Sequence, residues 1–479
     1  MSTMLSFSSW RIIMLKKVLI ANRGEIALSI FRACRELGIK TVSIYSSADK
    51  DQPIVYLTDE SYCIGNSAST DSYLNKESIL LLAKTVGCDG IHPGYGFLSE
   101  NPDFARQVEE CGIKLVGPSA DTMKLMGDKL SARTLMEKIG VPLVPGSKGA
   151  VKNKDELMKI AEDIGYPLLL KPSAGGGGKG MRRIYREEEL ADSFHMAKYE
   201  AKMAFGDDRI YVEKLIENPR HIEIQILADS EGNVIHLNER ECSLQRRNQK
   251  IIEESPCNFL DDKVLREMGQ CAVKCAKACN YEGAGTIEFV VDHKGNFYFI
   301  EMNTRIQVEY PVTEMITGIN LIKEQLKIAS GISLKWKQED IKREGHAIEV
   351  RINAQNPLES FAPDCGKIDF YMPPGGYNTR FETFIYQGIE ILPFYDSMIG
   401  KLIVKGDDRL DAIKKMRRAV EETVIGGIKT NLGFQYAILH ETDFLQGKID
   451  TGYIDKHEEK LLKEMKLVQE ASKHDGFET

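Results

Sequence analysis

Short apolar runs alternate with amphipathic stretches over about the first 125 residues of the chain. A short apolar run predicts a buried strand, and apolar positions spaced by three and four residues predict a helix. This alternation of strands and helices is typical of a doubly wound parallel sheet. The predicted strands are residues 18–21, 41–45, 90–92 and 114–117, and the predicted helices include 25–37 and 76–86.

The hydrophobic pattern changes near residue 128 and again near residue 345. The second block predicts helices at 128–139 and 154–164, and then strand–turn–strand patterns as far as about residue 303. The third block predicts alternating strands, a turn at 373–376 and a helix at 408–422. The residues after about 455 are charged and helical, which is typical of a surface helix or a frayed terminus.

Composition and charge exclude several classes of protein. Of the 479 residues, 42% are hydrophobic and 28% are charged, which excludes a disordered or fibrous chain. The net charge of −8 disfavours general nucleic-acid binding. No apolar run approaches the roughly 18 residues of a membrane-spanning helix. The N-terminal residues lack the order of features of a signal peptide, so we expect a cytoplasmic protein whose translation could begin at Met4 or Met14.

Ten cysteines are scattered along the chain without a Cys-x-x-Cys pair. They are too few for a disulfide framework at this length. Cys271, Cys275 and Cys279 repeat every four residues, so a metal site on one helix face is conceivable. We favour a stripe of small buried side chains, because a free cysteine packs as a small hydrophobe.

Four consecutive glycines, at 175–178, follow an apolar strand and lie between Lys171 and Lys179. Consecutive glycines lose much backbone entropy on ordering, and close approach of backbone N–H groups to phosphate oxygens would explain them. The loop is not a Walker loop, because Gly180 rather than Ser or Thr follows Lys179 and residues 181–185 predict another strand. We interpret it as a strand–loop–strand flap over a polyphosphate, with a flexible linker as the alternative.

Two carboxylates are predicted to face each other on a hairpin. Residues 285–309 predict two strands joined by a tight turn. Antiparallel pairing of Asp292 with Phe297 would place Glu288 directly opposite Glu301 on one face. Like charges in such a pair repel, and their burial adds a desolvation cost. A divalent cation removes both problems, and hard oxygen ligands suit Mg²⁺.

Polar side chains continue along the second strand of this hairpin with a period of two. One face carries Glu301, Asn303, Arg305, Gln307 and Glu309, and the other face is mainly apolar. Such a row of mixed charge predicts the wall of an active site, with a solvated sheet face as the alternative.

Two further stretches carry candidate chemistry. Residues 239–250 hold several cations and amides, which suits anion recognition, although a charge run is most often a solvated face. His221, Glu223 and Gln225 alternate with isoleucines on a predicted strand. A lone histidine such as His221 is most often a hydrogen-bonded structural residue.

Several motifs together carry a family resemblance. They are Asn22-Arg-Gly-Glu-Ile-Ala, His92-Pro-Gly-Tyr-Gly-Phe-Leu-Ser-Glu, the glycine loop at 171–181, the stretch 239–250, Glu301-Met-Asn-Thr-Arg-Ile-Gln-Val-Glu and Tyr395-Asp-Ser-Met-Ile. In this order they resemble biotin carboxylase, the ATP-grasp component of acetyl-CoA, pyruvate and related biotin-dependent carboxylases. The resemblance covers about residues 15–455, and the combination of motifs is highly specific.

The resemblance implies an α/β and α+β fold of three domains. These would be an N-terminal doubly wound parallel sheet at 15–127, a central ATP-grasp domain at 128–331 with a mobile glycine-rich flap at about 145–216, and a C-terminal mixed α/β domain at 332–460. Residues 1–14 would be an extension and residues 461–479 a charged tail.

The reaction that the resemblance implies is the first half-reaction of acetyl-CoA or pyruvate carboxylase. ATP, with Mg²⁺ or Mn²⁺, phosphorylates bicarbonate to carboxyphosphate, which delivers CO₂ to N1′ of biotin on a carrier protein. The sequence has no Ala/Val-Met-Lys-Met biotinylation motif, so we expect the biotin carboxyl carrier protein and the carboxyltransferase subunit on separate chains. The family also suggests a homodimer, with neither nucleic acid nor a membrane as partner. The sequence does not specify the final carboxyl acceptor.

The resemblance also implies roles for single residues, by their position in the motifs. The ATP phosphates would be held by Lys129, Lys171, Gly177 and Gly178. The adenine and ribose would contact Glu213, Lys214, Leu215, Ile216 and His221, with Gln245 and Asn248 close to the nucleotide. The metal ligands would be Glu288, Glu301 and Asn303. Bicarbonate would be held by Lys250, Arg305, Gln307 and Val308. Glu309 would deprotonate bicarbonate, and Arg351 would stabilise the biotin enolate.

Two positions depart from the family pattern. The family usually has His at the position of Asn248, and an amide cannot carry the charge of a histidine, so nucleotide affinity could differ. The family also usually has His where Tyr310 follows Glu309, a change that we expect to affect packing more than chemistry. Two alternative functions stay open: another ATP-grasp ligase that activates bicarbonate or a carboxylate for an amine, and an ATP-binding scaffold with damaged catalysis.

Overall fold

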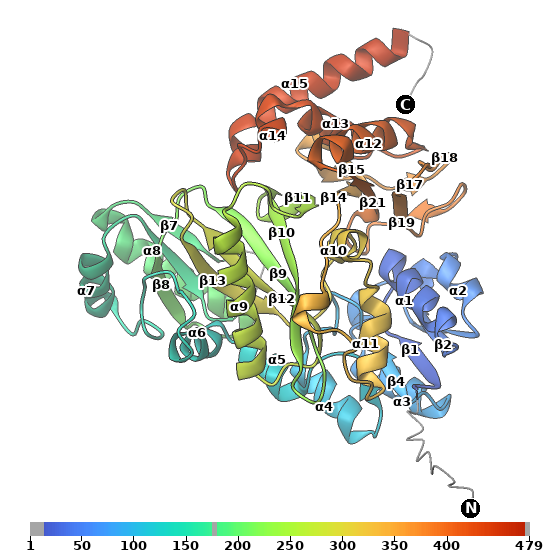
Figure 1. Ribbon diagram of the computed structural model, residues 1–479, viewed down its shortest axis with the longest axis horizontal. Helices are drawn as coiled ribbons and strands as arrows, with labels where there is room; N and C mark the ends of the chain where they lie inside the picture. The colour runs from blue at the N-terminus through green and yellow to red at the C-terminus, as the bar shows by residue number, and fades with distance from the viewer. Residues whose placement is uncertain (1–13, 175–179, 475–479) are drawn as a thin grey trace, which may run out of the picture.

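Five parallel strands form the N-terminal sheet, in the order β3-β2-β1-β4-β5. The computed structural model describes residues 14–174 and 180–474 (Figure 1). The strands are β1 (Lys17–Ile20), β2 (Lys40–Ser46), β3 (Glu60–Gly65), β4 (Gly90–His92) and β5 (Lys114–Leu115). The helices around them are α1 (Gly24–Glu36), α2 (Pro53–Leu57), α3 (Lys76–Thr85), α4 (Pro102–Glu110) and α5 (Ala120–Gly127). The prediction of a doubly wound parallel sheet is confirmed.

A small lobe follows, built on three antiparallel strands in the order β7-β6-β8. Its elements are α7 (Lys154–Ile164), β6 (Leu168–Pro172), β7 (Arg182–Ile184), α8 (Leu190–Phe205) and β8 (Ile210–Lys214). The preceding helix α6 (Lys129–Lys138) packs into the core of the central sheet instead. One core cluster, formed by buried residues between Val151 and Val212, fills this lobe. The strands β6 and β7 flank the glycine loop as predicted, while Gly177 and Gly178 lie outside the described residues.

An eight-stranded antiparallel sheet forms the centre of the molecule, in the order β13-β12-β9-β10-β11-β14-β21-β19. Its strands are β9 (Arg220–Ala228), β10 (Val234–Arg246), β11 (Gln249–Ser255), β12 (Gly283–Val291), β13 (Phe297–Asn303), β14 (His346–Asn353), β19 (Thr379–Thr383) and β21 (Met398–Gly406). The helices beside it are α9 (Asp262–Ala278), α10 (Tyr310–Thr317) and α11 (Leu321–Ala329). Because β11 pairs with β14, the sheet runs without interruption across the predicted boundary at residue 331.

The C-terminal part adds short two-stranded ladders and helices to this sheet. The ladders are β15 (Gln355–Asn356) with β16 (Ala362–Pro363), β17 (Gly366–Lys367) with β20 (Glu390–Ile391), and β18 (Phe370–Met372) with β22 (Val424–Gly426). The helices are α12 (Arg409–Glu422), α13 (Leu432–His440), α14 (Thr442–Leu445) and α15 (Tyr453–His474). The end of α15 projects from the body at the top of Figure 1. The domain limits given above stay predictions.

The cysteine stripe packs into the core, as predicted. Cys271 and Cys275 lie on the buried face of α9, and Cys279 caps its C-terminus in the same apolar cluster. Within residues 14–174 and 180–474, no helix combines the length and the apolarity that crossing a membrane requires.

Glu254 on β11 forms a buried ion pair whose contribution to stability can be tested. Its carboxylate accepts from Arg409 Nε at 2.6 Å and lies 2.7 Å from His346 Nε2. Burial alone would raise the pKa of Glu254, but His346 and Arg409 outweigh burial and lower it from 4.5 to about 2. A carboxyl with a lowered folded-state pKa stabilises the fold above its unfolded-state pKa, and the stabilisation is lost as the pH falls through the folded-state value.

Glu254→Gln is therefore expected to lower the free energy of unfolding at pH 7 by on the order of 3 kcal/mol. The deficit should shrink steadily below a pH of about 4.5, where the wild-type carboxyl of the unfolded chain also takes up a proton. Urea unfolding followed by circular dichroism at a series of pH values measures this. An equal deficit at pH 7 and at pH 3 would show that the ion pair contributes no net electrostatic stability.

Candidate active site

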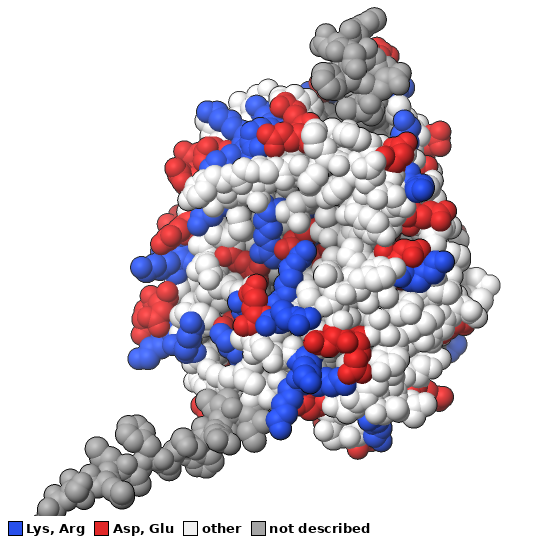
Figure 2. Space-filling view, turned by 90° about the vertical axis from the view of Figure 1, so that its right-hand side faces the viewer, with Lys and Arg blue, Asp and Glu red and all other residues white. Residues whose placement is uncertain are grey.

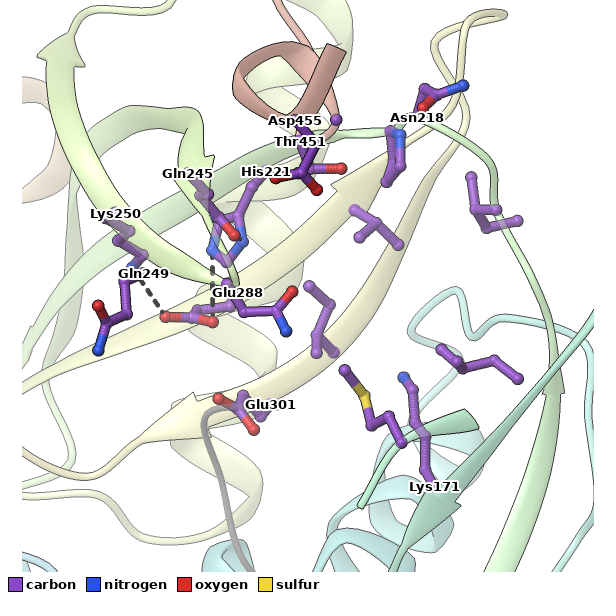
Figure 3. A pocket seen from close by; sticks show the side chains of 18 of the residues that line it. Lys171, Asn218, His221, Gln245, Gln249, Lys250, Glu288, Glu301, Thr451 and Asp455 are labelled. Carbon is purple, nitrogen blue, oxygen red and sulfur yellow. Dashed lines mark hydrogen bonds and ion pairs between the residues drawn. The ribbon is translucent and has the colours of Figure 1, made fainter. Parts of the chain in front are cut away.

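A cavity of about 700 Å³ lies between the small lobe and the eight-stranded sheet. Every predicted site residue that the structure describes lines it. They are Lys129, Lys171, Glu213, Lys214, Leu215, Ile216, His221, Gln245, Asn248, Lys250, Glu288, Glu301, Asn303, Arg305, Gln307, Val308, Glu309 and Arg351. Figure 3 shows Glu288 between His221 and Lys250, with Glu301 nearby and Lys171 reaching in from the lobe. The predicted cleft is present, while the individual roles stay predictions.

Glu288 and Glu301 are directly paired across β12 and β13, which confirms that they face each other. The predicted register at the turn was wrong, because Phe297 pairs with Val291 rather than with Asp292. The Asp292 side chain instead accepts from backbone N–H groups of the turn, including that of Asn296. An irregularity between Phe289 and Glu288 then shifts the register by one residue and restores the acidic pair.

The predicted second strand of the hairpin was too long. β13 ends at Asn303, and the chain then runs irregularly to α10. Glu100 accepts from the backbone N–H of Thr304, which holds the chain where the strand stops. Glu309 is the N-cap residue of α10 and is followed by Pro311 in its first turn. The side chains of Arg305, Gln307 and Glu309 still reach the cavity, so the predicted wall is present although the strand is not.

Glu288 is the more heavily contacted of the two facing acids. Its Oε1 accepts from Gln307 at 2.7 Å, Asn303 at 2.9 Å and Lys250 at 3.1 Å. Its Oε2 lies 3.3 Å from His221 Nε2. Burial would raise the pKa of Glu288, but Lys250 and His221 outweigh burial and lower it well below its ordinary value. The side chain is therefore a carboxylate at neutral pH.

The donor set beside Glu288 suits a divalent cation. Glu301 Oε2 lies 3.6 Å from Lys129 Nζ, and Glu301 faces Glu288 across the ladder. Asn303 lies two residues further along on the same side and adds an amide. Two carboxylates and an amide oxygen are hard ligands of the kind that Mg²⁺ and Mn²⁺ prefer. These three residues fit the predicted metal site.

Lys250 joins three carboxylates on the floor of the cavity. Its Nζ lies 2.5 Å from Glu223 Oε2, 2.5 Å from Glu309 Oε1 and 3.1 Å from Glu288 Oε1. Burial would lower the pKa of Lys250, but the carboxylates outweigh burial and raise it well above its ordinary value. Lys250 is therefore a permanent cation in contact with Glu309.

Glu309 lies between two cations. Arg351 Nη2 is 2.9 Å from Glu309 Oε2, on the side opposite Lys250. Burial would raise the pKa of Glu309, but Lys250 and Arg351 hold it below its ordinary value despite the neighbouring Glu223. Glu309 is ionised and can accept a proton from a ligand in the cavity.

Three functional contacts were missed by the sequence reasoning. Glu100 pairs with Arg305 at 2.7 Å, and it is the last residue of the His92 motif, which was used only for the resemblance. Glu223 contacts Lys250, and its place on the polar face of a predicted strand was a usable signal. Arg240 is fully buried and donates to Glu223 at 2.5 Å, Gln225 at 2.6 Å and Gln307 at 2.8 Å.

The lobe presents its own charges to the cavity. Lys171 Nζ lies 2.6 Å from Glu213 Oε2, which also pairs through Oε1 with Arg133 at 2.5 Å. Lys214 Nζ donates to the carbonyl oxygen of Tyr166 at 2.5 Å, which fixes the end of β8. A ligand that enters between the lobe and the sheet therefore meets cations from one side and the acidic pair from the other.

The two departures from the family pattern have local explanations. Asn248 has a φ of +64° in the turn between β10 and β11, a left-handed conformation that asparagine tolerates well. Tyr310 is fully buried, and Lys401 Nζ lies 4.4 Å from the centre of its ring. The same Lys401 Nζ donates to the carbonyl oxygen of Val308 at 2.6 Å. Tyr310 thus packs behind the cavity wall and does not line the cavity.

Family models match three consecutive parts of the chain. Residues 14–123 match the N-terminal domain of biotin carboxylase, residues 128–337 match the ATP-binding domain of the carbamoyl-phosphate synthase L chain, and residues 349–456 match the C-terminal domain of biotin carboxylase. The matches follow the order of the three blocks in the sequence.

Curated relatives align over nearly the whole chain. Biotin carboxylase 1 of Bacillus subtilis is 53% identical over 446 residues, which are 93% of this chain and 99% of the relative. A pyruvate carboxylase subunit of Methanothermobacter thermautotrophicus is 51% identical over 458 residues, which are 95% of this chain and 93% of the relative.

Solved structures agree with this relationship. One is the biotin carboxylase domain dimer of Hydrogenobacter thermophilus 2-oxoglutarate carboxylase, in complex with MgADP, ADP and bicarbonate. It is 50% identical, has a TM-score of 0.90 and covers 93% of this chain and 98% of its own. Biotin carboxylase from Campylobacter jejuni, in a β-γ-ATP complex, is 49% identical, has a TM-score of 0.90 and covers 92% of this chain and 99% of its own. The motifs, the fold, the family models and these relatives together place the chain in the biotin carboxylase family.

Proposed function

We propose that this chain catalyses the ATP- and bicarbonate-dependent carboxylation of biotin N1′ on a separate biotin carboxyl carrier protein, through carboxyphosphate. The observation that carries the proposal is the position of Glu309. It lies between Lys250 and Arg351 in the same cavity as the facing acids Glu288 and Glu301. A proton acceptor, an anion site and a metal site therefore open onto one space.

Phosphoryl transfer from ATP to bicarbonate needs charge neutralisation and in-line positioning more than covalent chemistry. Lys129 and Lys171 would hold the phosphates from the lobe side. Mg²⁺ held by Glu288, Glu301 and Asn303 would neutralise charge on the phosphate oxygens when bound. The structure of the Hydrogenobacter relative contains MgADP and bicarbonate, which supports the same ligands here.

Bicarbonate is a weak nucleophile, and removal of its proton makes it stronger. Glu309 is the acceptor within reach of the anion site that Lys250, Arg305 and the 307–308 segment would form. Bicarbonate would share Lys250, which is one of the two cations that now neutralise Glu309. This sharing would raise the basicity of Glu309 once the substrate is bound.

Carboxyl transfer to biotin needs a stabilised enolate oxygen, because deprotonation of the ureido nitrogen places negative charge on that oxygen. Arg351 is the guanidinium that we assign to this task, since it lines the cavity and contacts Glu309. Its planar charge suits an oxyanion better than a flexible ammonium would.

Bicarbonate-dependent ATP hydrolysis stimulated by free biotin tests the proposal. The assay separates the function from its two alternatives, because a scaffold would hydrolyse no ATP and a different ligase would not respond to biotin. Relatives are named both as biotin carboxylases and as part of a pyruvate carboxylase, so the partner carboxyltransferase would determine the final acceptor. We also propose that the chain acts in the cytoplasm, because it resembles bacterial biotin carboxylases over nearly its whole length.

Glu288→Ala is expected to raise the Mg²⁺ concentration for half-maximal activity by about ten-fold or more, because it removes a facing carboxylate. Glu217→Ala is the matched control, since Glu217 lines the same cavity but is exposed. A Mg²⁺ titration of both variants at saturating ATP measures the effect. An unchanged titration for Glu288→Ala would remove the acidic pair from the metal site.

Assembly as a homodimer is proposed as well, because the Hydrogenobacter relative is a dimer. Three large apolar side chains, Phe370, Met372 and Tyr377, are 50%, 44% and 83% exposed near β18. Figure 2 shows one side of the molecule, where wide uncharged surface surrounds a central group of basic and acidic side chains. Light scattering of the purified chain measures the mass directly, and a monomeric mass at micromolar concentration would contradict the proposal.

A further inference from the structure

A second pair of facing carboxyls lies behind Arg351. Glu253 on β11 is the direct cross-strand partner of Glu349 on β14, and both residues are 0% exposed. Directly paired side chains in a sheet have Cβ atoms about 4.5–5.5 Å apart, where like charges repel. Unlike Glu288 and Glu301, these two acids do not line the cavity, so no ligand there can neutralise them.

Arg351 is the only basic group that contacts this pair among the residues that the structure describes. Its Nε donates to Glu253 Oε1 at 2.6 Å, and its Nη2 lies 2.5 Å from the same oxygen. The same guanidinium contacts Glu309 at 2.9 Å. Glu253 therefore holds Arg351 from behind while Glu309 meets it at the cavity.

The remaining oxygens of the pair are unsatisfied. Within the described part of the chain, Glu253 Oε2 and both carboxyl oxygens of Glu349 are buried without a hydrogen-bond partner. A buried carboxylate without partners has a large desolvation cost. A proton on one of the two acids would remove one of the two like charges.

The charged groups around the pair cannot neutralise two anions. Those that face it are Lys250 from β11, Arg351 from β14, Lys401 from β21 and Glu309 from the start of α10. Lys250 already contacts three other carboxylates, and Lys401 donates to Val308 and pairs with Glu25 at 3.4 Å. Arg351 is shared with Glu309, which leaves less than one positive charge for Glu253 and Glu349 together.

The pKa values of the two side chains agree with this shortage of positive charge. Burial raises the pKa of Glu253 to about 7, although Arg351 opposes the shift. Burial also raises the pKa of Glu349 well above its ordinary value, against the opposing charge of Lys401. The first acid of the pair to ionise is the one that contacts Arg351.

We propose that Glu253 and Glu349 are positioning residues for Arg351, and that they carry one proton between them while the Glu253 carboxylate fixes the guanidinium in the orientation that biotin meets. The inference rests on the proposed function, because it concerns the biotin step. When the pH rises and this proton leaves, a second anion appears behind Arg351. It draws the guanidinium away from the cavity, and biotin binding weakens.

Steady-state kinetics with free biotin test the proposal. Glu253→Gln is expected to raise the KM for biotin by about ten-fold while the KM for ATP stays within about two-fold of wild type. Glu349→Gln mimics the protonated acid, so at pH 7 its KM for biotin should stay within about two-fold of wild type. The wild-type KM for biotin should fall as the pH rises through about 7, where Glu253 loses its proton, and should rise again at higher pH, where Glu349 loses its proton. In Glu349→Gln the rise at alkaline pH should be absent.

Glu254→Gln is the matched control. Glu254 is the next residue on β11 and is equally buried, but it faces the other way and pairs with Arg409. This variant should lose stability without a change in the KM for biotin. A general packing defect would instead affect both variants alike.

Three results would overturn the inference. The first is a KM for biotin in Glu253→Gln that equals the wild-type value. The second is a rise in the KM for biotin at alkaline pH that persists in Glu349→Gln. The third is a KM for biotin in the wild-type protein that does not change with pH. The pH dependence of the wild-type KM is measured without any variant, so a folding defect of a variant cannot affect this test. Failure of the proposed function would look different, because wild-type ATP hydrolysis would then show no stimulation by biotin at any pH.

Discussion

Glu309→Gln is expected to lower kcat by about 10²–10⁴-fold while the KM for ATP stays close to wild type. The amide keeps the size of the side chain and can still accept from Lys250 or from Arg351 through its one oxygen, but it cannot accept the proton of bicarbonate. The loss should therefore fall on the chemical step, while binding of the nucleotide on the lobe side is preserved.

Bicarbonate-dependent ATP hydrolysis in the presence of biotin measures this loss. Glu314→Gln is the matched control, because Glu314 is a buried acid on the same helix, α10, and pairs with Arg380 away from the cavity. Near-normal turnover of Glu309→Gln, or an equal loss in Glu314→Gln, would refute Glu309 as the base.

Arg240→Met should cause the largest loss of stability, because it removes a fully buried guanidinium and the hydrogen bonds that it donates to buried partners. Arg240 joins Glu223, Gln225 and Gln307 through three short hydrogen bonds. Removing one partner of a buried ion pair typically costs about 3–5 kcal/mol. The Gln307 side chain, which also contacts Glu288, would lose one of its anchors.

Urea unfolding of Arg240→Met against wild type measures this effect. Arg186→Met is the control, since Arg186 pairs with Glu189 on the surface, where the side chain is 77% exposed. Its stability should hardly change, because exposed ion pairs contribute little. Equal stability of Arg240→Met and wild type would mean that the buried network is not needed for folding.

Much of the fold follows from local patterns that do not depend on tertiary context. The strands β1, β2 and β4 are largely buried between helices, so each was visible as a short run of mostly apolar residues. β3 was missed because it is an edge strand whose side chains are half-buried or exposed, which leaves no apolar run. The joining of β11 to β14 could not be predicted either, because nothing local encodes a pairing across about 100 residues.

In the site, too, the features that depend on local sequence could be predicted, and those that depend on long-range contacts could not. The facing of Glu288 and Glu301 could be predicted because a hairpin fixes the register over a short loop, although the irregularity beside Glu288 could not. The contact of Glu100 with Arg305 joins the N-terminal part to the cavity and needs the tertiary fold. Arg240 looked like part of a surface charge run, and only its complete burial identifies it as structural.

The pairing of β11 with β14 also bears on how the chain can be divided. A fragment that stopped near residue 331 would expose the backbone N–H and C=O groups of β11 along a long bare edge, which is a template for aggregation. A fragment that began there would expose β14 in the same way. The C-terminal half, which carries Arg351, is therefore not expected to fold on its own. Expression of either half alone should give insoluble protein unless the other half is supplied in trans.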